Sequence, residues 1–217
     1  MSAFDNWNLN SWCMPIFYFC HDSQSTATKP IHMKLLVPAG VRLFFNQIFC
    51  VLALLAGPFG LAIAGPTEIP LLEEPGVLPK IEFFDESNKI VTLEKWSGKV
   101  VVLNIWATWC EPCRTEMPTL DRLQGKLGGE RFEVVALSID EAGLGVVKQF
   151  FEEIGVKNLG LYIDPTYKAV EQLSVYGLPA TILIDTNGQE LGRLVGPAEW
   201  DTPEMIAFFE DIIVSQF

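Results

Sequence analysis

The sequence predicts an α/β fold, in which buried strands alternate with helices and an antiparallel hairpin lies near the C-terminus. Two runs rich in β-branched residues, 99–106 and 132–139, are typical of central strands buried on both faces. Each is followed by a segment with helical features, and two later strands are joined by Asn187-Gly188, a strong signal for a tight hairpin turn. This order of elements is that of an α/β domain.

Each element follows from local sequence signals. Two short apolar strands in hairpin spacing are expected first, at 81–84 and 90–93, with a turn at 85–88. The strand at 99–106 leads into a helix at 111–127, which Gly128-Gly129 ends. After the strand at 132–139 we expect a helix at 146–154 closed by Gly155, a strand at 161–164, a helix at 167–175, strands at 181–185 and 190–195, and a helix that Thr202-Pro203 opens and that runs to about Val214.

The chain of 217 residues fits one domain of roughly 150 residues with an N-terminal extension. A hydrophobic fraction of 49% argues against disorder, and a formal charge of −12 argues against a general nucleic-acid binder. The acidity suits a domain whose partners are proteins, and it is equally what a well-solvated surface looks like.

Residues 33–64 have the features of a secretory signal. Lys34 and Arg42 supply positive charge, 48–56 is an apolar core, and Ala62-Ile63-Ala64 is a cleavage signal. An uncleaved membrane anchor is the alternative, because 43–64 is long enough to span a bilayer. Residues 1–32 contain no assignable periodic stretch, and our hypothesis is that translation starts at Met33.

Residues 65–79 are predicted to be a tether without regular structure, because four prolines interrupt them. The folded domain is expected at 80–217. Its cysteines and histidines restrict its chemistry, since both histidines and three of the five cysteines precede residue 51. No histidine remains for a Ser-His or Cys-His nucleophile or for a histidine-ligated metal, and we predict neither a metal site nor a cofactor.

The two remaining cysteines, Cys110 and Cys113, form a C-x-x-C pair where a central strand runs into a helix. In the first turn of a helix they can bridge with little backbone change. Cys110 meets the free N–H groups and the positive end of the helix dipole, which stabilise a thiolate. Cys113 should be more buried, so we expect Cys110 to exchange with partners and Cys113 to resolve the mixed disulfide. A static bridge would add little stability, and a zinc site lacks further ligands.

The run at 104–118, NIWATWCEPCRTEMP, closely resembles the TlpA/ResA-type proteins, exported thiol-disulfide oxidoreductases of bacteria with a thioredoxin fold. The resemblance covers about residues 70–215 and implies an N-terminal β-hairpin and a strand–helix insertion at about 140–175. It also implies a cis-proline facing the disulfide, which Pro179 matches. The backbone of Leu178 would then pair with an extended partner segment, and Trp109 would shield the substrate-binding surface beside Cys110.

Glu116 lies on the apolar stripe of the same helix, with Leu120 and Leu123. A buried carboxyl one turn from Cys113 would have a raised pKa and could exchange a proton with that thiol, and the family has an active-site glutamate at this position. The alternative is a surface residue at the edge of the stripe. Glu111 and Pro112 between the cysteines favour a reductant over a strong oxidant.

Together these observations predict an exported protein-disulfide reductase of the periplasm or cell envelope that a membrane electron donor keeps reduced. The resemblance implies apocytochromes c or copper-site proteins as partners, in cytochrome c biogenesis or copper-site maturation. Two alternatives stay open: a disulfide-forming oxidant, and a copper-handling module that uses the two thiolates as ligands. A peroxidase is excluded, because Thr108 stands only two residues before Cys110 and the T-x-x-C pattern is missing.

Overall fold

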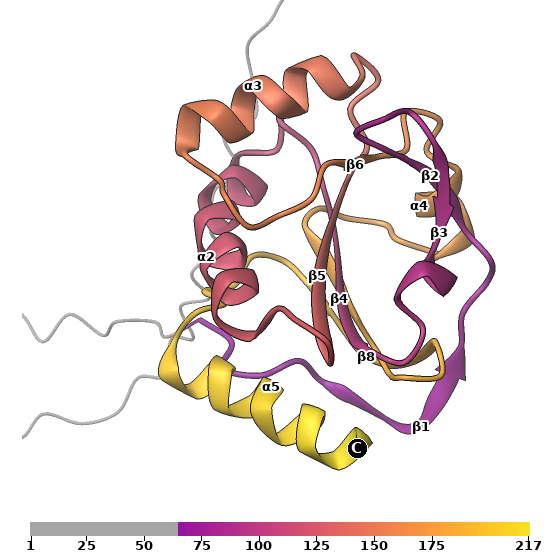
Figure 1. Ribbon diagram of the computed structural model, residues 1–217, viewed down its shortest axis with the longest axis vertical. Helices are drawn as coiled ribbons and strands as arrows, with labels where there is room; N and C mark the ends of the chain where they lie inside the picture. The colour runs from indigo at the N-terminus through magenta and orange to yellow at the C-terminus, as the bar shows by residue number, and fades with distance from the viewer. Residues whose placement is uncertain (1–64) are drawn as a thin grey trace, which may run out of the picture. The chain divides into compact units, whose positions relative to one another are not determined.

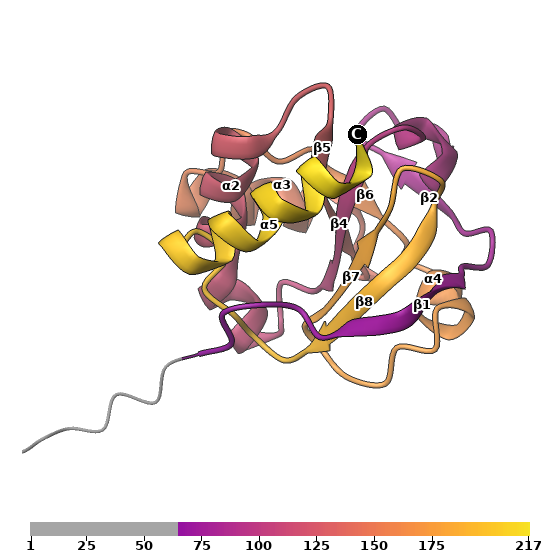
Figure 2. The same ribbon diagram turned by 90° about the horizontal axis from the view of Figure 1, so that it is seen from below.

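A computed structural model describes residues 65–217, which build one eight-stranded sheet in the order β1-β8-β7-β4-β5-β6-β2-β3 (Figures 1 and 2). The strands are β1 (Leu71–Val77), β2 (Glu82–Asp85), β3 (Ile90–Thr92), β4 (Val100–Trp106), β5 (Phe132–Ser138), β6 (Tyr162–Ile163), β7 (Ala180–Ile184) and β8 (Gln189–Val195). The helices are α2 (Glu111–Leu127), α3 (Leu144–Ile154), α4 (Lys168–Gln172) and α5 (Pro203–Gln216), and a 3-10 turn, η1, spans Leu93–Trp96. The predicted α/β fold is confirmed. The predicted signal at 33–64 and residues 1–32 lie outside the described residues.

Strand β4 is the centre of the sheet and carries the site at its end. It pairs parallel with β5 and antiparallel with β7, and all seven of its residues are buried. Asn104 is the single polar side chain of the strand. Because both faces of β4 are covered, the strand is held rigidly, and the loop at 107–110 and helix α2 start from its C-terminal end.

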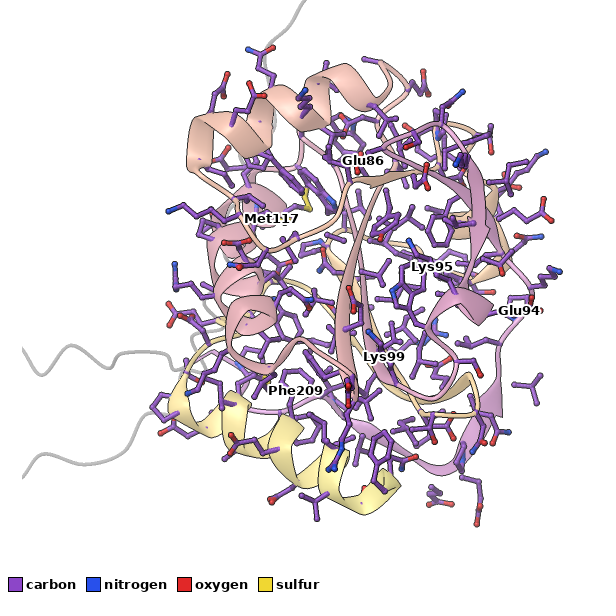
Figure 3. The ribbon with its side chains drawn as sticks, viewed as in Figure 1. Glu86, Glu94, Lys95, Lys99, Met117 and Phe209 are labelled. Carbon is purple, nitrogen blue, oxygen red and sulfur yellow. A yellow bond between two sulfur atoms is a disulfide. The ribbon has the colours of Figure 1, made fainter. Side chains whose placement is uncertain are left out.

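Helices α2, α3 and α5 lie on one side of the sheet, and α4 lies on the other (Figures 1 and 2). Trp106 of β4 packs against Phe150 and Phe151 of α3, with ring centroids 5.4 and 5.5 Å apart. Met117 of α2 and Phe209 of α5 are fully buried and point from their helices into the core (Figure 3). Each such side chain contributes roughly 1.5–3 kcal/mol by burial, so this layer fixes α2 over β4.

Strand β1 corrects the prediction that residues 65–79 form a tether without regular structure. Leu71–Val77 pairs antiparallel with β8, with an irregularity between Leu71 and Gly76, and Ile69 is buried at 1% exposure. The prolines are tolerated because β1 is an edge strand, where a missing N–H leaves no partner unpaired on the open side. The folded unit therefore begins before residue 80.

The other element boundaries differ from the expected ones by a few residues. Helix α4 is shorter than the predicted 167–175, because Tyr167 and Ser174 adopt left-handed conformations with φ of 60° and 53°. Helix α2 has the predicted bounds and continues through Pro118. Within residues 65–217, no helix has the length and apolar composition that a membrane crossing requires.

Candidate functional site

Cys110 and Cys113 are joined by a disulfide at the N-terminus of α2. Their Cα atoms are 5.3 Å apart, within the range that a disulfide requires. Cys110 is the N-cap residue, and its sulfur accepts a hydrogen bond from the Cys113 N–H at 3.3 Å. In the reduced protein this N–H and the helix dipole would stabilise a thiolate on Cys110. Cys110 is 7% exposed and Cys113 fully buried, the asymmetry that the sequence predicts.

The loop before Cys110 is held by hydrogen bonds at Thr108. Its N–H donates to Asp140 Oδ2 at 2.9 Å and its hydroxyl donates to Asp140 Oδ1 at 2.6 Å. Arg114 Nη1 donates to the Thr108 carbonyl from the other side at 3.2 Å. Asp140 is itself buried and accepts a hydrogen bond from the Ser138 hydroxyl at 2.7 Å, so it caps this loop.

The carboxylate of Glu111 lies near the guanidinium of Arg114. Glu111 is strongly exposed, and the Arg114 Nε atom lies 3.8 Å from its Oε2 atom. The Arg114 guanidinium also lies over the ring of Phe150, 4.5 Å from its centroid, which fixes a positive charge beside the Thr108 carbonyl. This cation offsets part of the negative potential that Glu111 adds at the helix N-terminus.

An apolar groove of about 510 Å³ lies directly beside Cys110. The bond between Leu178 and Pro179 is cis, as the resemblance implies, and Pro179 is buried next to β7. Leu178 and Trp109 both line the groove, and Trp109 is 63% exposed. The remaining lining residues are Pro112, Ile139, Tyr167, Val170, Val175, Tyr176 and Gly177. The predicted substrate-binding residues Trp109 and Leu178 therefore share one surface with Cys110.

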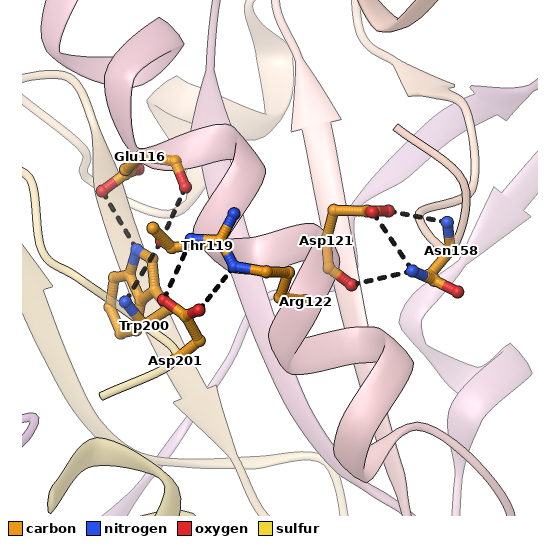
Figure 4. A network of polar contacts seen from close by, with 7 residues as sticks. All are labelled: Glu116, Thr119, Asp121, Arg122, Asn158, Trp200 and Asp201. Atoms are coloured by element: carbon orange, nitrogen blue, oxygen red, sulfur yellow. Dashed lines mark hydrogen bonds and ion pairs between the residues drawn. The ribbon is translucent and has the colours of Figure 1, made fainter. Parts of the chain in front are cut away.

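Glu116 is buried beneath the site, 2% exposed, and both of its carboxylate oxygens accept hydrogen bonds. Oε1 accepts from Asn104 Nδ2 at 2.8 Å. Oε2 accepts from the backbone N–H of Ala198 and from the indole Nε1 of Trp200, each at 3.0 Å. Figure 4 shows the link from Glu116 to Trp200, and Thr119 ties the backbones of both residues together. The alternative of an exposed residue at the edge of the helix stripe is excluded.

Burial raises the pKa of Glu116 from 4.5 to about 7, because desolvation disfavours the charged carboxylate. The hydrogen bonds from the Ala198 N–H, the Asn104 amide and the Trp200 indole act in the opposite direction and limit the rise. The carboxyl thus titrates near neutral pH, one helical turn from the buried Cys113. This range is suited to a group that takes up and releases protons at physiological pH.

Sequence reasoning missed the residues that bind the Glu116 carboxylate, namely Asn104, Ala198 and Trp200, and it missed Thr181, which binds Asn104. Asn104 Nδ2 also donates to the Thr181 hydroxyl at 3.0 Å, which links β4 to the strand that follows Pro179. A lone asparagine inside the apolar run at 99–106 was the available signal, because a buried amide needs partners. Trp200 lies in a loop 84 residues from Glu116 and had no comparable signal.

Comparisons with known proteins place this geometry in context. The family model described as "AhpC/TSA family" matches residues 76–189. Thiol-disulfide oxidoreductase ResA of Bacillus thuringiensis (strain Al Hakam) is 32% identical over 160 residues, which cover 71% of this chain and 88% of that protein. ResA of Bacillus subtilis (strain 168) is 30% identical over 118 residues, 54% of this chain and 65% of that protein. A putative thiol:disulfide interchange protein DsbE from Chlorobium tepidum superposes with a TM-score of 0.55 at 28% identity, over 67% of this chain and 98% of that one.

Proposed function

Because the chain belongs to the AhpC/TSA family and is a thiol-disulfide oxidoreductase of the ResA type, we propose that it reduces disulfides in exported partner proteins. The enzyme class is that of a thioredoxin-like protein-disulfide reductase. The observation that carries the proposal is the reachable Cys110 beside an apolar groove, with the fully buried Cys113 bonded to it. The predicted signal or anchor at 33–64 supports a location in the periplasm or cell envelope.

The exchange follows two displacements. The Cys110 thiolate attacks one sulfur of the partner's disulfide, so that a Cys110–partner bond forms and the partner's other sulfur leaves as a thiolate that takes up a proton. The Cys113 thiol then loses its proton to Glu116 and attacks Cys110. The partner leaves with both sulfurs reduced, and Cys110 and Cys113 are left as the disulfide of this structure, oxidised by two electrons. A membrane electron donor would return these electrons.

The partner segment is expected to lie extended in the groove beside Cys110. The Leu178–Pro179 backbone offers main-chain pairing, and the apolar lining, with Trp109 and Tyr176 exposed, suits a segment with apolar side chains next to its cysteine. Apocytochromes c or copper-site proteins are the partners that the family resemblance supports.

The reduction potential is expected to identify the protein as a reductant. Equilibration of the full chain with glutathione or dithiothreitol buffers, followed by thiol quantification, should give about −250 mV, as for thioredoxin-like reductants. The opposite charges of Glu111 and Arg114 partly cancel, so they stabilise the Cys110 thiolate less than the surroundings of a strong oxidant would. A value of about −120 mV would contradict the proposal and identify a disulfide-forming oxidant.

Glu116→Gln is expected to slow the release step, in which Cys113 must lose its proton. In the parent protein the release rate should rise with pH through about 7 as Glu116 ionises. The variant should lack this rise and be slower by on the order of 100-fold, the usual contribution of a general base. Stopped-flow measurement of partner release across pH, with attack by Cys110 followed separately as the control, tests this role. Unchanged pH–rate profiles would refute it.

A further inference from the structure

The two carboxylate oxygens of Glu116 have unequal hydrogen-bond partners. Each oxygen offers two lone pairs. Oε2 uses both, for the Ala198 N–H and the Trp200 indole N–H. Oε1 accepts one hydrogen bond, from Asn104 Nδ2, and keeps one lone pair free among the described contacts. A proton on Oε2 would displace a donor that has no other partner there, so the neutral carboxyl carries its proton on Oε1.

An acceptor for this proton lies in the same side chain that now donates to Oε1. Asn104 is fully buried, and among the described residues its Oδ1 has no hydrogen-bond partner. A half turn of the amide exchanges Oδ1 and Nδ2. Oδ1 would then lie beside Glu116 Oε1 and the Thr181 hydroxyl, positions that Nδ2 occupies at 2.8 and 3.0 Å, and could accept a hydrogen bond from each. Nδ2 would take the position of Oδ1, which has no partner among the described residues, so in either orientation one end of the amide pairs with Glu116 and Thr181 and the other end stays unpaired.

We propose that Trp200 and Asn104 are positioning residues that divide the two oxygens of Glu116 between them. Trp200, with the Ala198 N–H, keeps Oε2 as an acceptor in both protonation states. Asn104 donates to Oε1 when Glu116 is ionised and, after its amide turns, accepts the Oε1 proton when Glu116 is neutral. The importance of this arrangement for exchange rests on the proposed role of Glu116. The neutral carboxyl of Glu116 would then always carry its proton on Oε1, without rotation of the carboxyl group.

The charged groups around Glu116 lie on several elements, and none of them is changed by the substitution of Trp200 that tests the proposal. Glu199, in the loop before α5, and Glu204, in α5, line a surface groove that reaches Glu116. The ion pair of Arg122 and Asp201 adjoins Trp200 (Figure 4). Strands β4 and β7 contribute only the uncharged Asn104 and Thr181, and on α2 the Cys113 sulfur does not titrate while it is in the disulfide.

The test is the carboxyl titration of Glu116 in the oxidised full chain, followed by the ¹³C chemical shift of labelled glutamate. Trp200→Phe keeps a ring beside Phe209 and removes the indole N–H, so the pKa of Glu116 should rise by about one unit. Trp106→Phe is the matched control, because the Trp106 indole N–H is buried without a partner among the described residues. An unchanged pKa in Trp200→Phe, or an equal rise in both variants, would overturn the assignment of Trp200.

The parent protein tests Asn104 without a substitution at that residue. The ¹⁵N and ¹H signals of its side-chain amide should shift with the same midpoint as the Glu116 carboxyl. In Glu116→Gln, which resembles the neutral acid, they should stay constant with pH. If the Asn104 amide signals of the parent protein do not change with pH, the proposed turn of this amide is contradicted. Since no thiol exchanges in these measurements, their failure leaves the proposed reductase function standing, and failure of the reductase assays leaves these assignments standing.

Discussion

Replacement of Cys113 with alanine should leave the protein covalently attached to its partners through Cys110. The fully buried Cys113 is the thiol that resolves the mixed disulfide in the proposed mechanism, and residues 65–217 hold no third cysteine that could replace it. The reachable Cys110 retains its helix N-terminus and can still attack. Non-reducing electrophoresis and mass spectrometry of the purified adducts should show partner cysteines bonded to Cys110, and turnover should be abolished.

Cys110→Ala is the matched control for this experiment, because it retains the buried thiol and removes the reachable one. It should form no adducts and should also lack turnover. Adducts that form through Cys113 in the Cys110→Ala variant would contradict the assigned roles. The identity of the trapped partners then distinguishes apocytochromes c from copper-site proteins as the physiological substrates.

The oxidised protein should lose stability as the pH rises from about 4.5 to about 7, because Glu116 ionises in the unfolded chain while it stays protonated in its buried position in the folded state. Its pKa is raised from 4.5 to about 7 in the folded state, so in this interval the folded state binds more protons than the unfolded one. The free energy of unfolding should therefore decrease through this window, by up to about 3 kcal/mol, and be constant above it. Urea unfolding at a series of pH values measures the effect.

The comparison with Glu116→Gln isolates this contribution. The variant cannot ionise, so its stability should show a flatter dependence on pH between 4.5 and 7. The pH range from 4.5 to 7 is well suited to this measurement, because histidines would otherwise titrate in it and no histidine follows residue 32. Parallel stability curves for the parent protein and the variant would show that the pKa of Glu116 is the same in the folded and the unfolded protein.

The sequence predicted the parts of the site that lie within one continuous segment. The C-x-x-C pair, its helix and the position of Glu116 on the buried stripe all follow from residues 104–127, where spacing along the helix decides which side chains share a face. The partners of Glu116 could not be predicted in this way. Asn104 is 12 residues distant and Trp200 is 84, and both contacts depend on how strands and loops meet in three dimensions.

The prediction that residues 65–79 lack regular structure is wrong at 71–77 for a related reason. Proline excludes a residue from a central strand but not from an edge strand. Whether a strand lies at an edge is a property of the sheet order, and in this sheet β1 occupies the outer position beside β8. A local rule could not supply that information.

Asn104 also has a consequence for how the central strand finds its place during folding. The residues of β4 are otherwise apolar and buried on both faces, so the hydrophobic pattern alone barely distinguishes one alignment from a neighbour shifted by a single residue. Such a slip would turn the amide to the opposite face and separate it from Thr181 and Glu116, leaving a buried polar group unpaired at about 1–3 kcal/mol. The same amide that serves the carboxyl of Glu116 thereby penalises misaligned sheets.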